Sequence, residues 1–326
     1  MSDRVRFGVL GCASIAVNKV IPGMQRSERC EVVAIGSRDA DRAAAAAAQL
    51  GIATSHGSYD DVLADEAVEA VYIPLPNHLH AEWTRRAAAA GRHVLCEKPL
   101  GLDVAEVTGM VDACRDAGVL MMEAFMYRHH PSWRRTYELV AEGAIGELLA
   151  IQARFTYHNV DPANIRNIAE YGGGAVMDIG CYPINVSRWF FGGEPTTVRA
   201  AVRRDPTFGT DALASAVLDF DGRQATFTCA TQLEPDQRVH LLGTKGRLEV
   251  EIPFNIPPDR PTRVVLTAGG DPPVAPEHTV FELPPADQYA AMADAFAAAV
   301  REGSPTPVPP EDAIGNMRVI EQVLAQ

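Results

Sequence analysis

Residues 5–16 read VRFGVLGCASIA, and this stretch decides the fold of the amino-terminal half. Val5–Leu10 is a short apolar run that predicts a buried strand, and a helical pattern follows at once. In the frame G-x-G-x-x-G, Gly11 is the glycine, while Ala13 and Ala16 take the other two places. Gly11 permits the tight turn, and the small side chains let a pyrophosphate approach the helix start. The stretch predicts a dinucleotide-binding turn; the alternative is a tight strand-to-helix turn without a ligand.

Apolar runs and helical patterns alternate over the first 123 residues. The expected strands are Val5–Leu10, Glu31–Gly36, Ala70–Leu75, His93–Glu97 and Val119–Ala124, and the expected helices are Ala13–Met24, a segment from Asp39 to Gly51, His78–Ala90 and Asp103–Ala117. Continuous apolar strands between amphipathic helices indicate a parallel sheet that is covered on both faces. We therefore expect an α/β Rossmann domain over residues 1–123.

The pattern changes after Phe125, and short runs of alternating polarity dominate from Leu148 onward. The expected strands are Val198–Arg203, Ala212–Phe220, Gln224–Cys229, Arg238–Gly243 and Arg247–Glu251; helices are expected at 131–142, 180–191, 286–302 and 311–325, and Pro-rich loops at 253–262 and 271–276. Adjoining strands after an α/β half indicate an antiparallel sheet. We expect an α+β domain for substrate binding and oligomerisation over residues 124–326, with a large, mostly antiparallel, open-faced sheet.

Composition narrows the class of protein. The chain has 326 residues, which suits two domains, and 42 acidic against 29 basic residues give a net charge of −13. That charge argues against a nucleic-acid binder. No apolar run approaches the length of a membrane span, and no signal segment opens the chain, so we expect a cytoplasmic protein without a membrane partner. The six cysteines lack a Cys-x-x-Cys spacing, which favours reduced, buried thiols.

The end of the second expected strand indicates which cofactor is preferred. It reads Gly36-Ser37-Arg38. A hydroxyl followed by a guanidinium suits a 2′-phosphate, because arginine makes forked, charge-assisted contacts with phosphate oxygens. We therefore predict NADP over NAD. The alternative is that Arg38 only pairs with Asp39 or Asp41.

Two further stretches carry candidate chemical groups. Glu97-Lys98-Pro99 follows a parallel strand, at the end where α/β folds bind ligands. Residues 172–185 read GGGAVMDIGCYPIN, and Asp178 and Tyr182 are four apart, so they share a face if the stretch is helical. The glycine triplet allows close backbone packing, which we interpret as packing beside the nicotinamide.

Hydride transfer to a carbonyl needs a proton donor, and the reverse reaction needs a base. Tyrosine has an ordinary pKa of about 10, and a nearby ammonium group lowers it. Lys98 and Tyr182 are therefore a suitable acid/base pair, while Asp178 could orient a sugar hydroxyl or hold Lys98. The alternatives are a packed core tyrosine and a helix-capping aspartate.

Four motifs together resemble the Gfo/Idh/MocA oxidoreductases, in that family's order and over nearly the whole chain. They are Gly11–Ala16 (GCASIA), Pro74–Glu82 (PLPNHLHAE), Glu97–Pro99 (EKP) and Gly172–Tyr182 (GGGAVMDIGCY). The chain is most similar to the branch of glucose–fructose oxidoreductase, NADP-dependent aldose 1-dehydrogenases and dihydrodiol dehydrogenase, where a tyrosine fills the catalytic place. The resemblance implies that Lys98, Asp178 and Tyr182 form the active site.

The candidate site residues fall into three groups. Those for the cofactor are Gly8, Gly11, Ala13, Ser14, Ile15, Ser37, Arg38, Pro74, Leu75, Asn77, His80, Glu97 and Lys98; the resemblance places Asn77, His80 and Glu97 along the cofactor. Those for the substrate are Arg128, Arg166, Asp178 and Tyr182, with His129 as a weaker candidate. The pairs His78-x-His80 and His129-His130 lack a carboxylate or cysteine partner at ligand spacing, so we expect no metal.

These observations predict an NADP-dependent enzyme that moves hydride to or from a sugar or polyol, as an aldose 1-dehydrogenase or a keto-sugar reductase. The alternative is a non-catalytic regulatory protein on the same fold that senses a dinucleotide or a sugar. We also expect a homodimer or higher homo-oligomer, because an open antiparallel sheet face needs cover.

Overall fold

The computed structural model describes residues 3–271 and 274–326, and these form two compact units. The first unit holds the chain up to Met126 together with Gln288–Met317, and the second holds Tyr127–Asp287 with Arg318–Gln326. The expected domain boundary at residue 123 lies close to Met126, where the chain first passes from one unit to the other. Residues 288–317, which we expected in the second domain, lie in the first unit. In the described ranges, no helix is long and apolar enough to cross a membrane.

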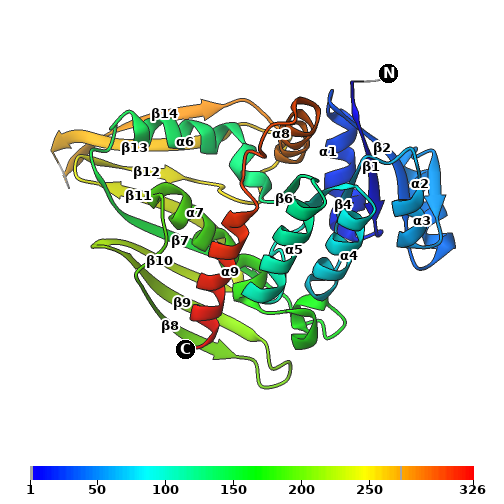
Figure 1. Cartoon of the computed structure of the whole chain (residues 1–326). Coiled ribbons are helices and arrows are strands. Elements are labelled where there is room, and N and C mark those ends of the chain that lie inside the picture. The colour runs from blue at the N-terminus through cyan, green and yellow to red at the C-terminus, as the bar shows by residue number, and fades with distance from the viewer. Residues whose placement is uncertain (1–2, 272–273) are drawn as a thin grey trace. The chain divides into compact units, whose positions relative to one another are not determined.

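The first unit is built on a six-stranded parallel sheet (Figure 1). Its strands are β1 (Val5–Leu10), β2 (Cys30–Gly36), β3 (Thr54–His56), β4 (Ala70–Ile73), β5 (His93–Cys96) and β6 (Met121–Glu123). They follow the order β3-β2-β1-β4-β5-β6, and every neighbouring pair is parallel. This is the order of a doubly wound Rossmann sheet, so the expected fold of this part is confirmed.

Helices connect these strands and cover the sheet. They are η1 (Ala16–Val20), a short π-helix that continues into α1 (Ile21–Arg26), then α2 (Ala40–Leu50), α3 (Tyr59–Ala64), α4 (Asn77–Ala89) and α5 (Val104–Asp116). Asp39 caps the start of α2, and Gly51 ends it with a left-handed backbone, as the sequence predicted. The central strands β1, β4 and β5 are almost wholly buried, which agrees with cover on both faces.

The late helix α8 (Gln288–Glu302) shows why the chain returns to the first unit. A Cβ atom added to Gly23 of α1 would lie 2.8 Å from Cβ of Tyr289, so the two helices touch at backbone distance. The ring of Phe296 is fully buried and lies 6.1 Å from the ring of Phe7 in β1. This helix therefore completes the hydrophobic core beside β1.

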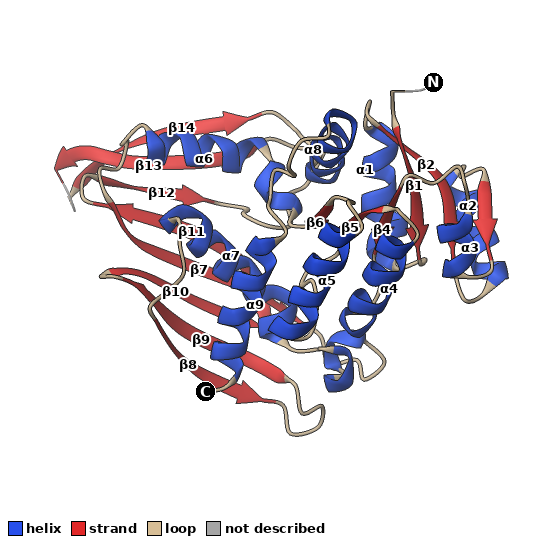
Figure 2. Ribbon diagram, viewed as in Figure 1, coloured by secondary structure: helices blue, strands red, loops and turns tan. Residues whose placement is uncertain are grey.

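The second unit is built on an eight-stranded sheet (Figure 2). Its strands are β7 (Leu148–His158), β8 (Thr197–Arg204), β9 (Asp211–Phe220), β10 (Arg223–Ala230), β11 (Gln232–Gly243), β12 (Gly246–Val250), β13 (Thr262–Asp271) and β14 (Ala275–Leu283). They follow the order β14-β13-β12-β11-β7-β10-β9-β8. The pair β7 and β10 is parallel and the other neighbouring pairs are antiparallel, so the expected mostly antiparallel sheet is confirmed.

Helices lie against one face of this sheet. They are α6 (Pro131–Ala141) over β12 and β13, and α7 (Cys181–Phe191) over β7 and β10, as Figure 2 shows. The π-helix η5 (Val176–Gly180) leads directly into α7, and the short turns η2 (Met126–His129), η3 (Ile165–Asn167) and η4 (Ala169–Tyr171) lie before it in the sequence. The last helix is α9 (Glu311–Leu324), and the division between the units falls within it.

Some strands and helices were not delimited from the sequence. β7 lies where strand patterns were expected to begin, at Leu148, without given bounds. β3 and α3 are too short, at three and six residues, to develop a recognisable periodicity. β13 spans the residues between the two expected Pro-rich loops, 253–262 and 271–276, and β14 begins near the end of the second. β14 is an edge strand with mostly exposed side chains, so it lacks the apolar alternation by which strands are recognised. Residues 272–273 of the second expected loop lie outside the described residues.

Candidate active site

Four neighbouring strands of the first unit end at candidate cofactor residues. Because β1, β2, β4 and β5 run parallel, their carboxyl ends lie at one edge of the sheet. The candidates are Gly11, Ala13, Ser14 and Ile15 after β1; Ser37 and Arg38 after β2; Pro74, Leu75, Asn77 and His80 after β4; and Glu97 and Lys98 after β5. Gly8 lies within β1 instead, where an added Cβ would come 2.5 Å from Val62 of α3, so helix packing by itself requires glycine there.

The turn after β1 has the backbone shape that a dinucleotide requires. Gly11 has a φ of +122°, and a Cβ atom there would lie 3.1 Å from Cδ2 of Leu75. Helical backbone begins at residue 14 and continues through residue 26. Arg42 closes the turn from the side, since its Nη2 donates to the carbonyl oxygen of Cys12 at 2.9 Å. A tight turn that opens directly into a helix presents N–H donors to a pyrophosphate, so the residues fit a dinucleotide.

Ser37 and Arg38 follow β2 at the same edge. Ser37 is buried, and its Oγ accepts a hydrogen bond from the backbone N–H of Asp39 at 3.2 Å. Arg38 is exposed and hydrogen-bonded to Tyr59; burial raises the pKa of Tyr59, and the charge of Arg38 opposes that rise. Across the described part of the chain, Arg38 makes no ion pair with Asp39 or Asp41. Arg38 therefore lies at the same edge of the sheet as the turn after β1, with Tyr59 as its hydrogen-bond partner.

His80 is fully buried and joins the loops after β4 and β5. Its Nδ1 lies 3.0 Å from the carbonyl oxygen of Pro99, and its Nε2 lies 2.8 Å from that of Leu75. Burial lowers the pKa of His80 to about 4, although both carbonyl contacts oppose the effect. The neutral imidazole carries one N–H, so it donates to one of these carbonyl oxygens at a time. His80 therefore lies between Leu75 and Pro99 and bonds to one of them.

The side chain of Glu97 is held by a hydrogen bond from β4. The hydroxyl of the fully buried Tyr72 donates to Oε1 of Glu97 at 2.7 Å. Burial raises the pKa of Tyr72, and the charge of Glu97 raises it further, so this hydroxyl keeps its proton. Lys98 follows Glu97 and is joined to Pro99 by a cis peptide bond. Tyr72 bonds to Glu97 on one side of Lys98, and His80 contacts the carbonyl oxygen of Pro99 on the other, both within the first unit.

In the second unit, Asp178 receives two strong donors on one oxygen. The hydroxyl of Tyr157 lies 2.6 Å from its Oδ2, and Nε of Arg166 lies 2.8 Å from the same atom. These residues come from β7, η3 and η5, so three separate segments converge. The charge of Asp178 raises the pKa of Arg166, and burial with that same charge raises the pKa of Tyr157. Both donors therefore stay protonated, and Asp178 serves them as an acceptor.

The glycine triplet packs against the chain itself. A Cβ atom on Gly173 would lie 2.5 Å from the carbonyl oxygen of Arg166, and one on Gly174 would overlap Oδ1 of Asp211. Gly174 also has a φ of +117°, which other residues rarely adopt. We expected the nicotinamide to be the close neighbour of this triplet. Within the second unit, Arg166 and Asp211 occupy that place, which explains the glycines without a ligand.

Asp211 anchors the start of the helix that carries Asp178 and Tyr182. It is buried at the first residue of β9, and its Oδ2 accepts a hydrogen bond from the N–H of Val176 at 2.7 Å. Burial raises its pKa to about 6, while the backbone donors oppose the rise. A carboxylate at a helix start satisfies N–H groups that would otherwise lack partners.

Tyr182 lies one helical turn beyond Asp178 and is 5% exposed. Its ring sits in an aromatic cluster, with ring centroids 5.8 Å from Tyr127, 5.5 Å from Phe155 and 5.0 Å from Phe254. This cluster fixes the ring, as it would for any core tyrosine. An ionised Tyr182 would raise the pKa of Arg166 further, so the two groups lie within electrostatic reach.

The remaining candidates differ in their surroundings. Arg166 joins Asp178, whereas Arg128 lies over the ring of Trp189, with its Cζ 4.6 Å from the ring centre. Sequence reasoning missed Tyr157 and Asp211, because both lie more than twenty residues from Asp178 in the sequence. Sheet pairing alone brings them near, and no local spacing signals it.

All six cysteines are free and buried, as expected. Among residues 3–271 and 274–326, no group of three or more histidine, cysteine, aspartate or glutamate side chains is placed to hold a metal ion.

Comparison with known proteins agrees with both units. Residues 5–125 match the model of the oxidoreductase family with an NAD-binding Rossmann fold, and residues 133–249 match the GFO/IDH/MocA C-terminal domain. The chain belongs to the Gfo/Idh/MocA oxidoreductase family. The resemblance that the motifs indicated is therefore confirmed.

Individual relatives cover nearly the whole chain. An uncharacterized oxidoreductase of Rhizobium meliloti is 51% identical over 323 residues, covering 98% of this chain and 96% of the relative. A D-xylose 1-dehydrogenase (NADP(+)) of Haloferax volcanii is 42% identical, covering 97% and 95%. The crystal structure of a 3-ketoreductase from Actinomadura kijaniata with NADP and TDP-benzene matches with a TM-score of 0.90 at 34% identity, covering 99% and 97%.

Proposed function

We propose that this member of the family is an NADP-dependent sugar or polyol oxidoreductase, of the aldose 1-dehydrogenase or keto-sugar reductase type. The observation that carries the proposal is the Asp178 cluster one helical turn from Tyr182, in which a carboxylate is held by Tyr157 and Arg166. Such a fixed polar group suits a substrate with hydroxyls. The similarity to a xylose dehydrogenase and a ketoreductase supports the same class.

The cofactor is NADP, and the first unit supplies its contacts. The turn at Gly11 and the following helix start hold the pyrophosphate, while Ser37 and Arg38 receive the 2′-phosphate. When bound, NADP supplies or accepts the hydride at its nicotinamide ring. The six free, buried cysteines support placing the enzyme in a reducing compartment, the cytoplasm.

Side chains of the protein transfer the proton that accompanies the hydride. Tyr182 takes the proton of the substrate hydroxyl during oxidation and returns it during reduction, and Lys98 lowers the pKa of Tyr182 toward neutrality. Asp178 orients the substrate through one of its hydroxyl groups. A positioned acid/base group of this kind contributes about 10²–10⁴-fold to the rate.

The test is absorbance of the reduced cofactor during a screen of aldoses, inositols and keto sugars with NADP(H) and NAD(H). Tyr182→Phe and Lys98→Ala should each lower kcat by about 100-fold or more while dinucleotide binding persists. Tyr137→Phe is the matched control, because Tyr137 is 48% exposed on α6. Tight dinucleotide binding without turnover on any substrate would favour the sensing protein instead.

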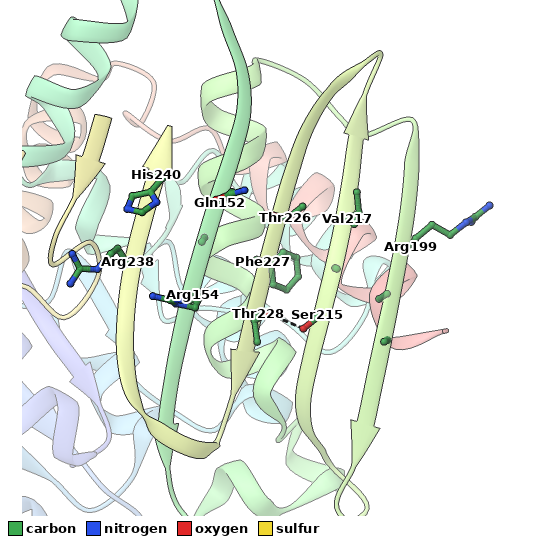
Figure 3. A pocket seen from close by; sticks show the side chains of 14 residues that line it. Gln152, Arg154, Arg199, Ser215, Val217, Thr226, Phe227, Thr228, Arg238 and His240 are labelled. Atoms are coloured by element: carbon green, nitrogen blue, oxygen red, sulfur yellow. Dashed lines mark hydrogen bonds between the residues drawn. The ribbon is translucent and has the colours of Figure 1, made fainter. Parts of the chain in front are cut away.

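We also propose that the protein is a homo-oligomer, at least a dimer, joined through the sheet face opposite α7. Figure 3 shows side chains of β7–β11 gathered on that face, where they line a cavity of about 610 Å³. Arg154 and Arg238 are register partners there, and each has a carboxylate partner, Asp236 and Glu249. Val217 on the same face is 41% exposed. Two of the three arginines that line the cavity are thus paired with carboxylates, and a face with paired charges and exposed apolar carbon suits contact with a second copy.

Light scattering at micromolar concentration tests this contact. The expected mass is at least twice that of the 35.1 kDa chain. Val217→Glu should lower it, whereas Val160→Glu, at a 51% exposed position outside the strands, should not. A monomeric mass for the unaltered protein would contradict the proposal.

A further inference from the structure

We propose that Arg166 and Asp178 together select a second substrate hydroxyl close to the reacting carbon, and that Tyr157 is the positioning residue for this pair. The inference rests on the proposed sugar oxidoreductase function. It narrows the substrate class to sugars or polyols that carry a hydroxyl beside the one that is oxidised or formed.

The first support is the way in which Arg166 is bonded. It contacts Oδ2 of Asp178 through Nε at 2.8 Å, not through its terminal nitrogens. In the described part of the chain, its guanidinium makes no other hydrogen bond or ion pair. The Arg166 side chain is 41% exposed, whereas that of Asp178 is 13% exposed. The terminal Nη groups can therefore donate to a ligand beside the carboxylate.

The second support is the chemistry of a hydroxyl group. A hydroxyl both donates and accepts, whereas a guanidinium only donates and a carboxylate only accepts. One sugar hydroxyl beside the pair can accept from a terminal nitrogen of Arg166 and donate to the carboxylate of Asp178, with charge-assisted bonds. A substrate without that hydroxyl keeps the bond between the pair but places no acceptor at the Arg166 donor that it buries, which costs more than the hydrogen bond itself. The pair therefore discriminates between substrates.

The third support is that both members are anchored from outside the pair. Tyr157, on β7, donates to Oδ2 of Asp178 at 2.6 Å and so fixes the carboxylate relative to the sheet. The carbonyl oxygen of Arg166 accepts from the N–H of Gly174 at 2.9 Å, with Gly173 packed beside it. The glycine turn thus sets the position of the arginine, and the sheet sets that of the aspartate.

The position of Arg166 and Asp178 relative to Tyr182 indicates which substrate hydroxyl the pair binds. Asp178 and Tyr182 lie about one turn apart on a continuous helical run, and residues at this spacing are neighbours on a helix surface. Arg166 lies within electrostatic reach of Tyr182. A sugar whose reacting oxygen contacts Tyr182 therefore offers a nearby hydroxyl, on one of the next carbons, to the pair.

The test compares D-glucose with 2-deoxy-D-glucose and 3-deoxy-D-glucose. We would measure kcat/KM with NADP⁺, and in parallel the calorimetric binding of the three sugars to Tyr182→Phe protein loaded with NADP⁺. The variants are Tyr157→Phe, which removes one hydroxyl, and Arg166→Lys, which keeps the charge and loses the fork. Tyr137→Phe and Arg135→Lys are the matched controls, since the Arg135 side chain is 28% exposed and pairs with Glu138 and Glu142 on α6. Thermal melts monitor folding.

We expect the unaltered enzyme to prefer glucose over at least one deoxy sugar by about 100-fold or more. Both variants should lower that ratio by at least tenfold, chiefly through lost activity on glucose, while the controls keep it. A ratio that is unchanged in both variants, or a ratio near one in the unaltered enzyme, would overturn the inference, because a merely structural role lowers all activities alike.

The binding measurement separates this inference from the proposed function. If the enzyme reduces no NADP⁺ with any of the three sugars, tighter binding of glucose than of a deoxy sugar, with that difference lost on adding Tyr157→Phe, would still support hydroxyl selection. Equal binding of the three sugars, or none, would overturn it.

Discussion

The cofactor edge of the first unit and the Asp178 cluster of the second are built in different ways. At the cofactor edge, most contributing residues lie in the segments that follow the parallel strands, and the main requirement is backbone shape, as at Gly11. In the Asp178 cluster, side chains converge from separate segments, and the nearby glycines let those segments touch. Small changes should therefore act locally at the cofactor edge and spread through the cluster.

The largest effect should come from Gly174→Ala. Gly174 has a φ of +117°, and an added Cβ would overlap the buried carboxylate of Asp211, so strain and overpacking combine. We expect a loss of about 3–5 kcal/mol in the free energy of unfolding, measured by denaturant titration. Gly192→Ala, at the far end of the same helix, is the matched control, with a φ of +69° and open space around it. It should cost about 1–2 kcal/mol; equal costs would remove the distinction.

The next effect concerns the pH dependence of stability. Burial raises the pKa of Asp211 to about 6 from its ordinary 3.8, so the folded state binds this proton more tightly than the unfolded state. The contribution of Asp211 to stability is therefore complete below pH 4 and is lost as the pH rises through 6. Relative to Asp211→Asn, the unaltered protein should lose about 3 kcal/mol between pH 4 and pH 7.

Asp205→Asn gives the opposite comparison for the same measurement. The hydrogen bond from Gln232 lowers the pKa of Asp205, so its contribution is present above its ordinary pKa and is lost as the pH falls. Chemical unfolding at a series of pH values measures both. A difference between the unaltered protein and Asp211→Asn that does not vary from pH 4 to pH 7 would show that Asp211 has an ordinary pKa.

The smallest of these effects should appear at the cofactor edge. Arg38→Ala removes the charge proposed for the 2′-phosphate, so KM for NADP should rise by about 10–100-fold while KM for NAD stays unchanged. Arg42→Ala removes the donor to Cys12 beside the turn, so it should affect both cofactors alike. Steady-state kinetics with each cofactor would separate the two residues. An equal rise in KM for NADP and for NAD in Arg38→Ala would show that Arg38 does not contact the 2′-phosphate.

The same contrast explains what could be predicted from the sequence. The parallel sheet and the order of its motifs were predictable, because apolar runs, helix caps and glycine turns act between residues close in the chain. The grouping of Asp178 with Tyr182 was predictable from their spacing. Tyr157 and Asp211 were not, because sheet pairing brings them to the cluster. The return of residues 288–317 to the first unit was missed for the same reason, since no local pattern records which core a helix joins.

That return has a consequence during protein synthesis. The first 126 residues leave the ribosome well before α8, yet α8 supplies the partner for α1 and buries Phe296 beside Phe7. The nascent amino-terminal unit must therefore wait, with part of its core uncovered, until some 160 further residues have been translated. The second unit waits as well, because its last segment, Arg318–Gln326, is translated after α8. The two units are therefore completed almost together at the end of translation, although their first residues emerge far apart.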